Sequence, residues 1–560
     1  MFITILVSIA FLWAFFQIGV LISVSNSNLQ NEESINNEFV LDNDADVPNV
    51  DAASKKTKEK AKGGTHLEVG ENKKKQKTDN RQEEAQEVLV GKKDSRDLES
   101  KDDGEDDPSK NPKSKKEKMN IVLFYADDWR FDSIGALNPI VHTPSLNKLA
   151  KEGVIFTQNA VTTSICWISR ACLATGQHYS RHKTLDIGDP VPFHQHWNDT
   201  LFGKLRDNGY FTGAVGKWQP GAIQPYMFNT SESYYGFHFQ ENGDHITDMN
   251  ERDALDFLRN KRKNVDDPFA LFVNFFAPHH YDGEPEQYFP QNKTQYLYKD
   301  IEIPFAPTCT QEAWENLPPF FTDTNDGRVR WRDRFNEKSK AQKMIKNYLR
   351  LISGVDMTIG NILEELERQN LTDNTLVIFT TDNGYYHAEH GLADKFYAHQ
   401  ESIRVPLIIR DPRMNKDQIG TRNEELTLSI DLAPTMLQAA EINVPDRMQG
   451  VDMSLLYRAA KDTDTDTDTD TAKQKTETAW RRNFYYEYPG IPGNMGHIPV
   501  QALVRRDFKY IYWPTHKYEE LFHLPSDPYE EHDLARNATF EVTMQQELRS
   551  EFKKVQADAQ

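Results

Sequence analysis

The sequence predicts an α/β protein in which helices cover both faces of a mostly parallel sheet. Apolar runs of strand length alternate with helical patterns, which is the order typical of parallel sheets. Polar residues follow the end of each run, where open α/β sheets bind their ligands. The chain has 560 residues, enough for a large core and more than one domain.

An uncharged apolar run opens the chain, from Phe2 to Val24. It is long enough to span a bilayer as a helix. The first basic residue is Lys55, so the positive-inside rule gives no firm orientation. We predict an uncleaved signal-anchor over residues 1–25, with cleavage after Ser25 as the alternative. The folded part is then lumenal or extracellular, on a single-pass membrane protein or a secreted one.

The segment 26–118 contains almost no aromatic residues and alternates Lys, Asp, Glu, Asn and Gln. It cannot bury enough apolar surface to fold, so we predict a disordered, charged stalk. A second low-complexity tract of alternating Asp and Thr lies within 461–478 and predicts an exposed loop insertion. The net charge of −20, without a basic face interleaved with aromatics, argues against a nucleic-acid partner.

Four continuous apolar runs after Met119 predict strands that are buried on both faces. The clearest helix spaces its apolar residues along one side between Ile345 and Leu366, and it stops before Asn374. The predicted strands are 120–126, 211–215, 269–276 and 376–380.

Polar side chains follow all four predicted strands. Any one pair could be a helix cap or a solvated turn, but the convergence of four strands on one sheet edge favours a site. The acids and the amide offer only oxygen ligands, which suit Ca²⁺ or Mg²⁺ rather than zinc. These residues are Asp127 and Asp128, Lys217, His279 and His280, and Asp382 and Asn383.

Cys166 heads the segment CWISRACLATGQ, at a point where a loop enters a predicted helix. The helix N-terminus favours an anion there. Lys217, Lys395 and His279 could contact the oxygens of that anion or help a leaving oxygen depart.

The segment around Cys166 resembles the signature of type I sulfatases, which continues from the cysteine to S-R and then T-G. FYADDW resembles the start of that family, and TTDNGYYHAEHGLADKFYAHQESIRVPLIIRDPR resembles its second long block. The resemblance extends from Met119 to about Ala535.

This resemblance implies an alkaline-phosphatase-like catalytic domain over 119–440 and a smaller C-terminal α+β subdomain over 441–560. It implies hydrolysis of sulfate monoesters, with a sulfated carbohydrate as the expected substrate. It also implies one bound Ca²⁺, and oxidation of Cys166 to formylglycine by a formylglycine-generating enzyme of the secretory pathway.

Site roles carry over by position in the matching motifs. Arg170 matches the arginine that holds the formylglycine, and His390 matches a substrate-side histidine, with a structural hydrogen bond as its alternative. Lys217 and Lys395 match two catalytic, sulfate-binding lysines, and His279 a histidine of the substrate pocket. The implied metal ligands are Asp127, Asp128, residue 166, Asp382 and Asn383.

Two positions depart from the family pattern. Ile168 stands where the family has proline or alanine, within the peptide that the modifying enzyme reads. Gln219 replaces a histidine and cannot take a proton near neutral pH. We expect His178, His182 or His280 to supply the base, or turnover to be slow.

Two other functions stay open. One is hydrolysis of phosphate or phosphonate monoesters on the same scaffold. The other is an inactive, membrane-tethered protein that binds sulfated glycans, which the two departures favour and the intact calcium ligands oppose.

Smaller features complete the predictions. Cys172 and Cys309 either form a disulfide or fill small buried apolar sites. Four arginines either bind an anionic polymer or form a solvated face with internal ion pairs, and we favour the solvated face. They are Arg328, Arg330, Arg332 and Arg334. Tyr485, Tyr486, Tyr488 and His497 either line a sugar pocket or, as we favour, belong to the core. Five N-x-S/T sequons fit the secretory pathway: Asn198, Asn229, Asn292, Asn370 and Asn537.

Overall fold

The computed structural model describes residues 118–186, 191–262, 264–458, 480–536 and 542–560. The predicted signal-anchor, the stalk, the Asp-Thr insertion and the sequon at Asn537 lie outside the described residues. In the part of the chain that is described, no helix has both the length and the apolar character needed to cross a membrane.

An eight-stranded sheet forms the centre of the fold, in the order β11-β2-β10-β7-β1-β6-β4-β5. Within it β10 runs antiparallel to both of its neighbours, and the other pairs are parallel. The four predicted strands are confirmed, and they lie side by side as β7-β1-β6-β4. The strands are β1 (Asn120–Ala126), β2 (Val154–Phe156), β4 (Phe211–Gly216), β5 (Thr230–Ser233), β6 (Phe269–Asn274), β7 (Thr375–Thr381), β10 (Leu407–Arg410) and β11 (Thr421–Asn423).

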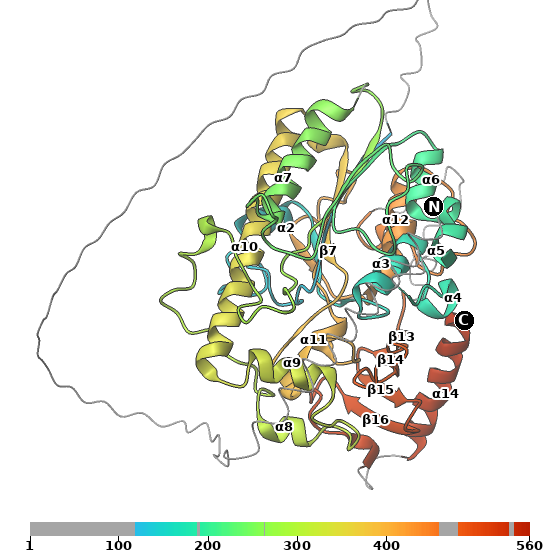
Figure 1. The fold of residues 1–560 in the computed structure, drawn as a ribbon. Helices are drawn as coiled ribbons and strands as arrows, with labels where there is room; N and C mark the ends of the chain where they lie inside the picture. Colours follow the sequence, from blue (N-terminus) through green and yellow to red (C-terminus); the bar gives the residue numbers. More distant parts are fainter. Residues whose placement is uncertain (1–117, 187–190, 263, 459–479, 537–541) are drawn as a thin grey trace, which may run out of the picture. The chain divides into compact units, whose positions relative to one another are not determined.

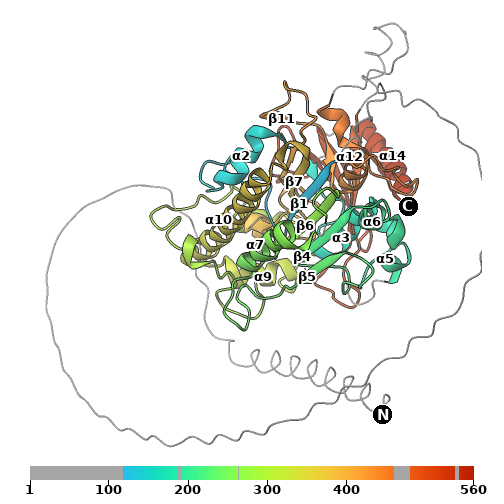
Figure 2. The ribbon, with the colours of Figure 1, turned by 90° about the horizontal axis from the view of Figure 1, so that it is seen from above.

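Helices cover both faces of this sheet (Figures 1 and 2). Side chains of β1 alternate between two cores, with Val122 and Phe124 on one face and Leu123 and Tyr125 on the other. This is why β1 reads as a continuous apolar run rather than an alternating one. One face carries α2 (Pro144–Glu152), α7 (Ile246–Asp256) and α10 (Lys338–Arg368); the other carries α3 (Cys166–Thr175), α6 (Leu201–Asp207) and α12 (Leu432–Ala439).

The predicted amphipathic helix is α10, and it is longer at its start than the apolar pattern indicates. Its buried side, with Ile352, Val355 and Ile359 fully inaccessible, packs on the sheet. The first residues of α10 are mostly polar, so hydrophobic periodicity gives no signal for them. Shorter helices connect the main elements: α4 (Tyr179–His182), α5 (Val191–Gln195), α8 (Gln311–Glu315), α9 (Asp326–Arg334) and α11 (Gln400–Ile403).

The C-terminal part is an antiparallel sheet with a helix on one face, as the predicted α+β subdomain requires. Tyr485, Leu503 and Leu521 pack against α14, whereas Tyr486 and Tyr488 pack toward the catalytic core. These tyrosines are therefore core residues and not the lining of an open pocket. The elements are β13 (Asn483–Tyr488), β14 (Val500–Arg505), β15 (Phe508–Trp513), β16 (Tyr518–His523) and α14 (Val542–Ala559).

Of the two alternatives for Cys172 and Cys309, the disulfide is wrong, because both thiols are free. The sulfur of Cys172 lies 3.2 Å from Nε2 of His182, and that of Cys309 donates to the carbonyl of His387 at 3.4 Å. The two cysteines therefore lie in different parts of the interior and contact different residues. The four sequon asparagines within the described residues, Asn198, Asn229, Asn292 and Asn370, are all exposed.

Candidate active site

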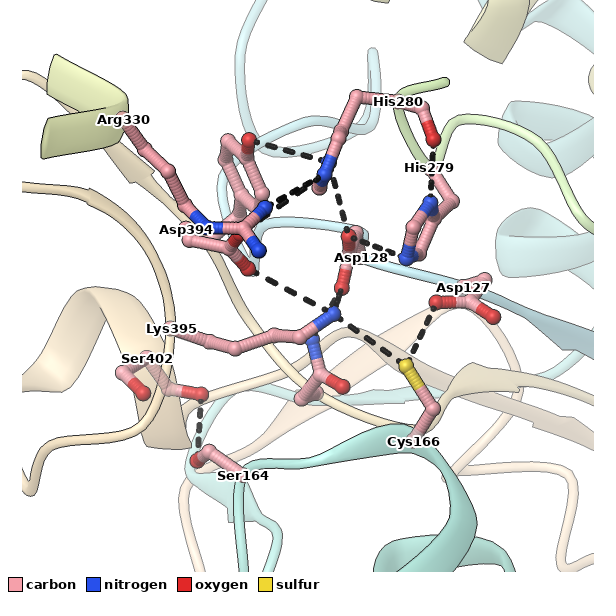
Figure 3. Close-up of polar contacts among 12 residues, drawn as sticks. Asp127, Asp128, Ser164, Cys166, His279, His280, Arg330, Asp394, Lys395 and Ser402 are labelled. Atoms are coloured by element: carbon pink, nitrogen blue, oxygen red, sulfur yellow. Dashed lines mark hydrogen bonds and ion pairs between the residues drawn. The ribbon is translucent and has the colours of Figure 1, made fainter. Parts of the chain in front are cut away.

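The carboxyl ends of the four central strands bring their polar residues to one edge of the sheet. Asp127 and Asp128 follow β1 directly, and Asp382 and Asn383 follow β7. Lys217 follows β4, where its backbone N–H donates to the carbonyl of Asn274 at 2.8 Å. Figure 3 shows Cys166, Asp127, Asp128 and Lys395 facing one another, with the two histidines after β6 beside them.

Cys166 is the first residue of α3 and is buried against this edge. Its Sγ donates to Oδ1 of Asp127 at 3.3 Å and accepts from Nζ of Lys395 at 3.3 Å. Burial and the nearby Asp127 raise the pKa of the thiol far above its usual range, so Cys166 as such is a protonated thiol and a poor nucleophile. The helix N-terminus still presents free N–H groups beside it, because the first α-helical bond runs from Ser169 to the carbonyl of Ile165.

Three buried cations lie among the carboxylates. Arg170 donates from Nε to Asp382 at 2.9 Å and from an Nη atom to Asp127 at 3.2 Å. Lys217 forms an ion pair with Asp127, and Lys395 forms one with Asp128. Burial lowers the pKa of each lysine, but the surrounding acidic groups together outweigh burial and raise the pKa above its usual value, so both lysines remain charged.

The carboxylates of Asp127 and Asp128, with the side chains around them, could bind a hard cation. One ligand atom each from Asp127, Asp128, Cys166 and His279 lies within 4.8 Å of the others. Oδ2 of Asp128 and Oδ1 of Asn383 are buried and have no hydrogen-bond partner among the described residues. Burial raises the pKa of Asp128 to about 7, and the neighbouring Asp127 contributes to the rise. Unsatisfied, mutually repelling oxygens of this kind fit a divalent ion such as Ca²⁺.

Both histidines after β6 border this cluster. Nε2 of His279 lies 3.6 Å from Oδ2 of Asp128, and Nδ1 of His280 lies 3.8 Å from the same atom. Burial lowers the pKa of both imidazoles, that of His280 to about 4, so both are neutral near pH 7. A neutral imidazole can accept a proton, which Gln219 cannot do.

The three histidines considered as replacements for the missing family histidine lie in different places. His280 lies at the site. His182 contacts Cys172, and the ring of His178 lies 6.0 Å from that of Tyr485, in the C-terminal sheet. The structure therefore favours His280 among the three.

The two departures from the family motif are both buried. Gln219 lines a small internal cavity with Arg170, Tyr125 and Trp218, and its Oε1 has no hydrogen-bond partner among the described residues. Ile168 is 1% exposed and belongs to the core between the catalytic domain and the C-terminal sheet. An isoleucine at this position adds apolar contact within the fold.

His390 lies in a separate buried cluster. Its ring stacks on that of His399, with centroids 4.4 Å apart, and its Nε2 lies 4.0 Å from Glu401. These surroundings favour the structural alternative for His390, and its contact with substrate stays a prediction.

Asp394 and Arg330 are site residues that the sequence analysis did not assign. Asp394 precedes Lys395 and lies 2.8 Å from Nη1 of Arg330, which also lies 2.9 Å from Nε2 of His280 (Figure 3). Positive φ angles of 77° at Asp394 and 91° at Phe396 hold the backbone around the lysine in a strained form. The arginine run thus forms internal ion pairs, as we favoured, and that of Arg330 with Asp394 reaches the site. It is not the solvated face that we predicted, because Arg328 and Arg334 are buried.

Comparisons with known proteins agree with this geometry. A family model described as "Sulfatase" matches residues 119–442, more than half of the chain, and one described as "N-sulphoglucosamine sulphohydrolase, C-terminal" matches residues 388–558. An N-acetylglucosamine-6-O-sulfatase of Bacteroides thetaiotaomicron is 25% identical over 494 residues, which cover 77% of this chain and 85% of the relative. An ulvan-active sulfatase of Formosa agariphila is 25% identical over 475 residues, which cover 79% of this chain and 81% of the relative.

Two further relatives widen the comparison. A multifunctional alkaline phosphatase superfamily protein, PehA of Trinickia caryophylli, is 25% identical over 504 residues, covering 76% of this chain and 92% of its own. A structure solved with its substrate D-glucosamine-2-N,6-O-disulfate superposes with a TM-score of 0.63 at 23% identity, covering 79% of this chain and 98% of that one. This last similarity supports the alkaline-phosphatase-like fold.

Proposed function

The chain belongs to the sulfatase family and is a sulfuric ester hydrolase, and we propose that it hydrolyses sulfate monoesters on a carbohydrate by way of a formylglycine made from Cys166. The reaction converts a sulfate monoester and water into an alcohol and inorganic sulfate. The observation that carries the proposal is the position of Cys166, at the start of α3 between Asp127 and Lys395.

Formylglycine at residue 166 would supply a hydrated aldehyde as the nucleophile, in place of the protonated thiol. Asp127 lies within hydrogen-bonding distance of the side chain at this position and could accept its proton. Arg170 fixes the orientation of Asp127 by bridging it to Asp382. The nucleophile is therefore held at the edge of the sheet by a buried, charge-assisted network.

Lys217 and Lys395 would bind the oxygens of the sulfate group. In this structure each ammonium is paired with an aspartate, and an entering anion would attract both of them. His279, whose side chain is 17% exposed, lies beside Asp128 and could hydrogen-bond to the substrate. Its neutral ring would have to take up a proton before it could protonate the leaving oxygen.

Asp127, Asp128, Asp382 and Asn383 would hold one Ca²⁺, which would supply positive charge next to a bound sulfate. Added calcium is expected to raise the melting temperature by a few degrees relative to the chelated protein, because it binds the folded state. Asn383→Ala should abolish this rise, whereas Asn242→Ala, at an exposed position, should keep it. Equal melting temperatures with calcium and with chelator would refute the calcium site.

Mass spectrometry of the tryptic peptide ending at Arg170 tests the central proposal. The protein should be produced in a cell that carries the formylglycine-generating system, with a second sulfatase as a control. We expect an aldehyde at residue 166 in most molecules. An unmodified thiol, with the control sulfatase converted, would overturn the proposal and favour the inactive glycan-binding alternative.

Phosphonate or phosphate monoester hydrolysis is the second candidate, because the fold is also that of a phosphonate monoester hydrolase of Agrobacterium radiobacter, with a TM-score of 0.63 at 19% identity. Turnover of an aryl sulfate, an aryl phosphate and an aryl phosphonate by the same converted preparation discriminates between them. We expect the highest kcat/KM with the aryl sulfate.

The proposed setting is the secretory pathway or the cell exterior, because conversion of the cysteine takes place in that compartment. Relatives named as extracellular sulfatases, from Drosophila melanogaster and Caenorhabditis elegans, support this setting. The four exposed sequons are compatible with it. Tethering through residues 1–25 remains a prediction from the sequence.

A further inference from the structure

Three exposed aromatic side chains lie in the segment between β5 and α7, two elements labelled in Figure 2. Tyr235, Phe237 and Phe239 are 52%, 49% and 44% exposed, and they alternate with the fully buried His238. The three aromatic side chains therefore face solvent, and the buried side chain of His238 fixes the segment to the interior. Exposed apolar clusters of this kind usually mark a binding surface.

The segment is fixed to the edge of the sheet that carries the active site. The N–H of Tyr234 donates to the carbonyl of Gly216 at 3.2 Å, directly before Lys217. The N–H of Ile246 donates to the carbonyl of His238 at 2.7 Å, and the ring of His238 lies 5.4 Å from that of Phe276. The aromatic side chains are therefore presented by an ordered backbone, which lowers the entropy cost of binding.

A chain of ring contacts joins these aromatics to the catalytic pocket. The ring of Phe237 lies 4.7 Å from that of Tyr281, which directly follows His280 in sequence. The ring of Phe276 lies 5.0 Å from that of His279 and 5.5 Å from Nζ of Lys217. The surface made by Tyr235, Phe237, Phe239 and Tyr281, here called the aromatic platform, is thus linked to the segment that carries His279 and His280 of the candidate active site.

Acidic residues flank the aromatic platform. Glu241 and Glu284 are exposed, whereas the carboxylate of Asp282, also exposed, is paired with Arg330 and Arg334. Carboxylates around an aromatic surface repel carboxylate and sulfate groups, and they tolerate neutral or amino sugars. The apolar C–H face of a pyranose ring can stack on an aromatic ring, and ligand sites combine such rings with a few polar groups.

We propose that the aromatic platform is a subsite for the uncharged sugar ring next to the sulfated one. The inference rests on the proposed sulfatase function and adds a substrate preference to it. The substrate is then an oligosaccharide in which a sulfated residue is linked to a neutral or amine-bearing pyranose, and not a polymer with an anionic group on every ring.

Three substrates separate this subsite from the chemistry. The aryl ester 4-nitrocatechol sulfate reports sulfate hydrolysis alone. Two disaccharides carry the same N-acetylglucosamine 6-sulfate and differ in its neighbour, galactose in one and glucuronate in the other. We expect the galactose disaccharide to have the lower KM, because glucuronate would meet the acidic residues.

Phe237→Ala should raise KM for the galactose disaccharide about tenfold and leave kcat/KM for the aryl sulfate within about twofold. Tyr296→Ala, at a 63% exposed aromatic outside the platform, serves as the matched control and should change neither. Glu241→Gln combined with Glu284→Gln should lower KM for the glucuronate disaccharide toward that of the galactose one.

If the wild-type protein does not hydrolyse the aryl sulfate, the sulfatase function itself is refuted. With that turnover intact, equal KM values for both disaccharides, no hydrolysis of either, or no effect of Phe237→Ala would overturn the subsite. A change of sedimentation coefficient in Phe237→Ala, with KM unchanged, would assign the platform to self-association and would also overturn it.

Discussion

Lys395 and Lys217 differ from surface lysines in that both ammonium groups are buried next to carboxylates. If they bind sulfate, Lys395→Met or Lys217→Met should lower kcat/KM for an aryl sulfate by roughly 10²–10³-fold, the cost of removing a preorganised electrostatic contact. Lys293→Met, which removes a surface ion pair with Asp248, is the control and should have no effect. A loss below tenfold in both variants would contradict the assignment.

We infer that Asp394 and Arg330 position Lys395, because their ion pair lies at the residue just before the lysine. Arg330→Gln should lower kcat about tenfold with little change in KM, and Arg330→Lys should restore part of the loss. Asp394→Asn combined with Arg330→Gln should lower kcat by less than the product of the two single effects, because the two residues share an ion pair, although Arg330 also pairs with Asp282 and Asp326.

The ion pair between Arg332 and Asp323 supplies the matched control for this double-mutant cycle of Arg330 and Asp394. It involves the same helix, α9, but its side chains are 43% and 77% exposed. Removing it should leave kcat unchanged, because exposed pairs contribute little. Strictly additive effects in the cycle of Arg330 and Asp394 would contradict the positioning role.

The helix α14 is an element whose apolar contacts hold one face of the C-terminal sheet. Leu548 is fully buried there, against a cluster that includes Leu503, Leu521 and Tyr485. Leu548→Ala should lower the free energy of unfolding by about 2–5 kcal/mol, through lost burial and the cavity it leaves. Chemical denaturation monitored by circular dichroism measures this change.

Glu547→Ala provides the comparison on the same helix, because that side chain is 59% exposed. Its effect should stay within about 0.5 kcal/mol. Equal effects of the two substitutions would mean that α14 does not pack on the sheet as described.

At the scale of the whole molecule, the central sheet could be predicted because its strands are buried on both faces. The run Asn120–Ala126 has the same bounds in the sequence pattern and in β1. The placement of Asp127, Asp128, Lys217, Asp382 and Asn383 at one edge of the sheet could also be predicted, because each follows the end of a strand. Their roles as metal or sulfate ligands stay predictions. The predicted domain boundary at 440/441 remains a prediction.

The parts that could not be predicted depend on contacts between distant segments. Asp394 and Arg330 are 64 residues apart, by the difference of their numbers, and their pairing has no local signal. The sequence also left the state of Cys172 open: its thiol is free and lies beside His182, ten residues along the chain. Burial of Tyr486 and Tyr488 follows from the docking of the C-terminal sheet on the catalytic core, which strand periodicity alone does not specify.

The C-terminal sheet and the catalytic core enclose a cluster of buried charges, and this arrangement makes stability depend on pH. Glu520 in β16 is 2% exposed and accepts a hydrogen bond from Nε1 of Trp513 at 2.6 Å. Burial raises its pKa from 4.5 to about 8. Lys509, also buried, is paired with Glu530 and donates to the carbonyl of Ala398 at 2.6 Å, which joins the two parts.

A carboxyl group whose pKa is raised in the folded state binds a proton there that the unfolded chain has already lost. Between pH 4.5 and about 8, Glu520 therefore makes stability fall as pH rises. Glu520→Gln keeps an acceptor for Trp513 and removes this penalty. The variant should match the wild type at pH 5 and exceed it at pH 8, by on the order of 2 kcal/mol. Melting temperatures of the wild type and the variant from pH 5 to 9 measure the difference. If the difference in melting temperature between Glu520→Gln and the wild type stays constant across this range, the buried carboxyl group does not lose its proton on unfolding.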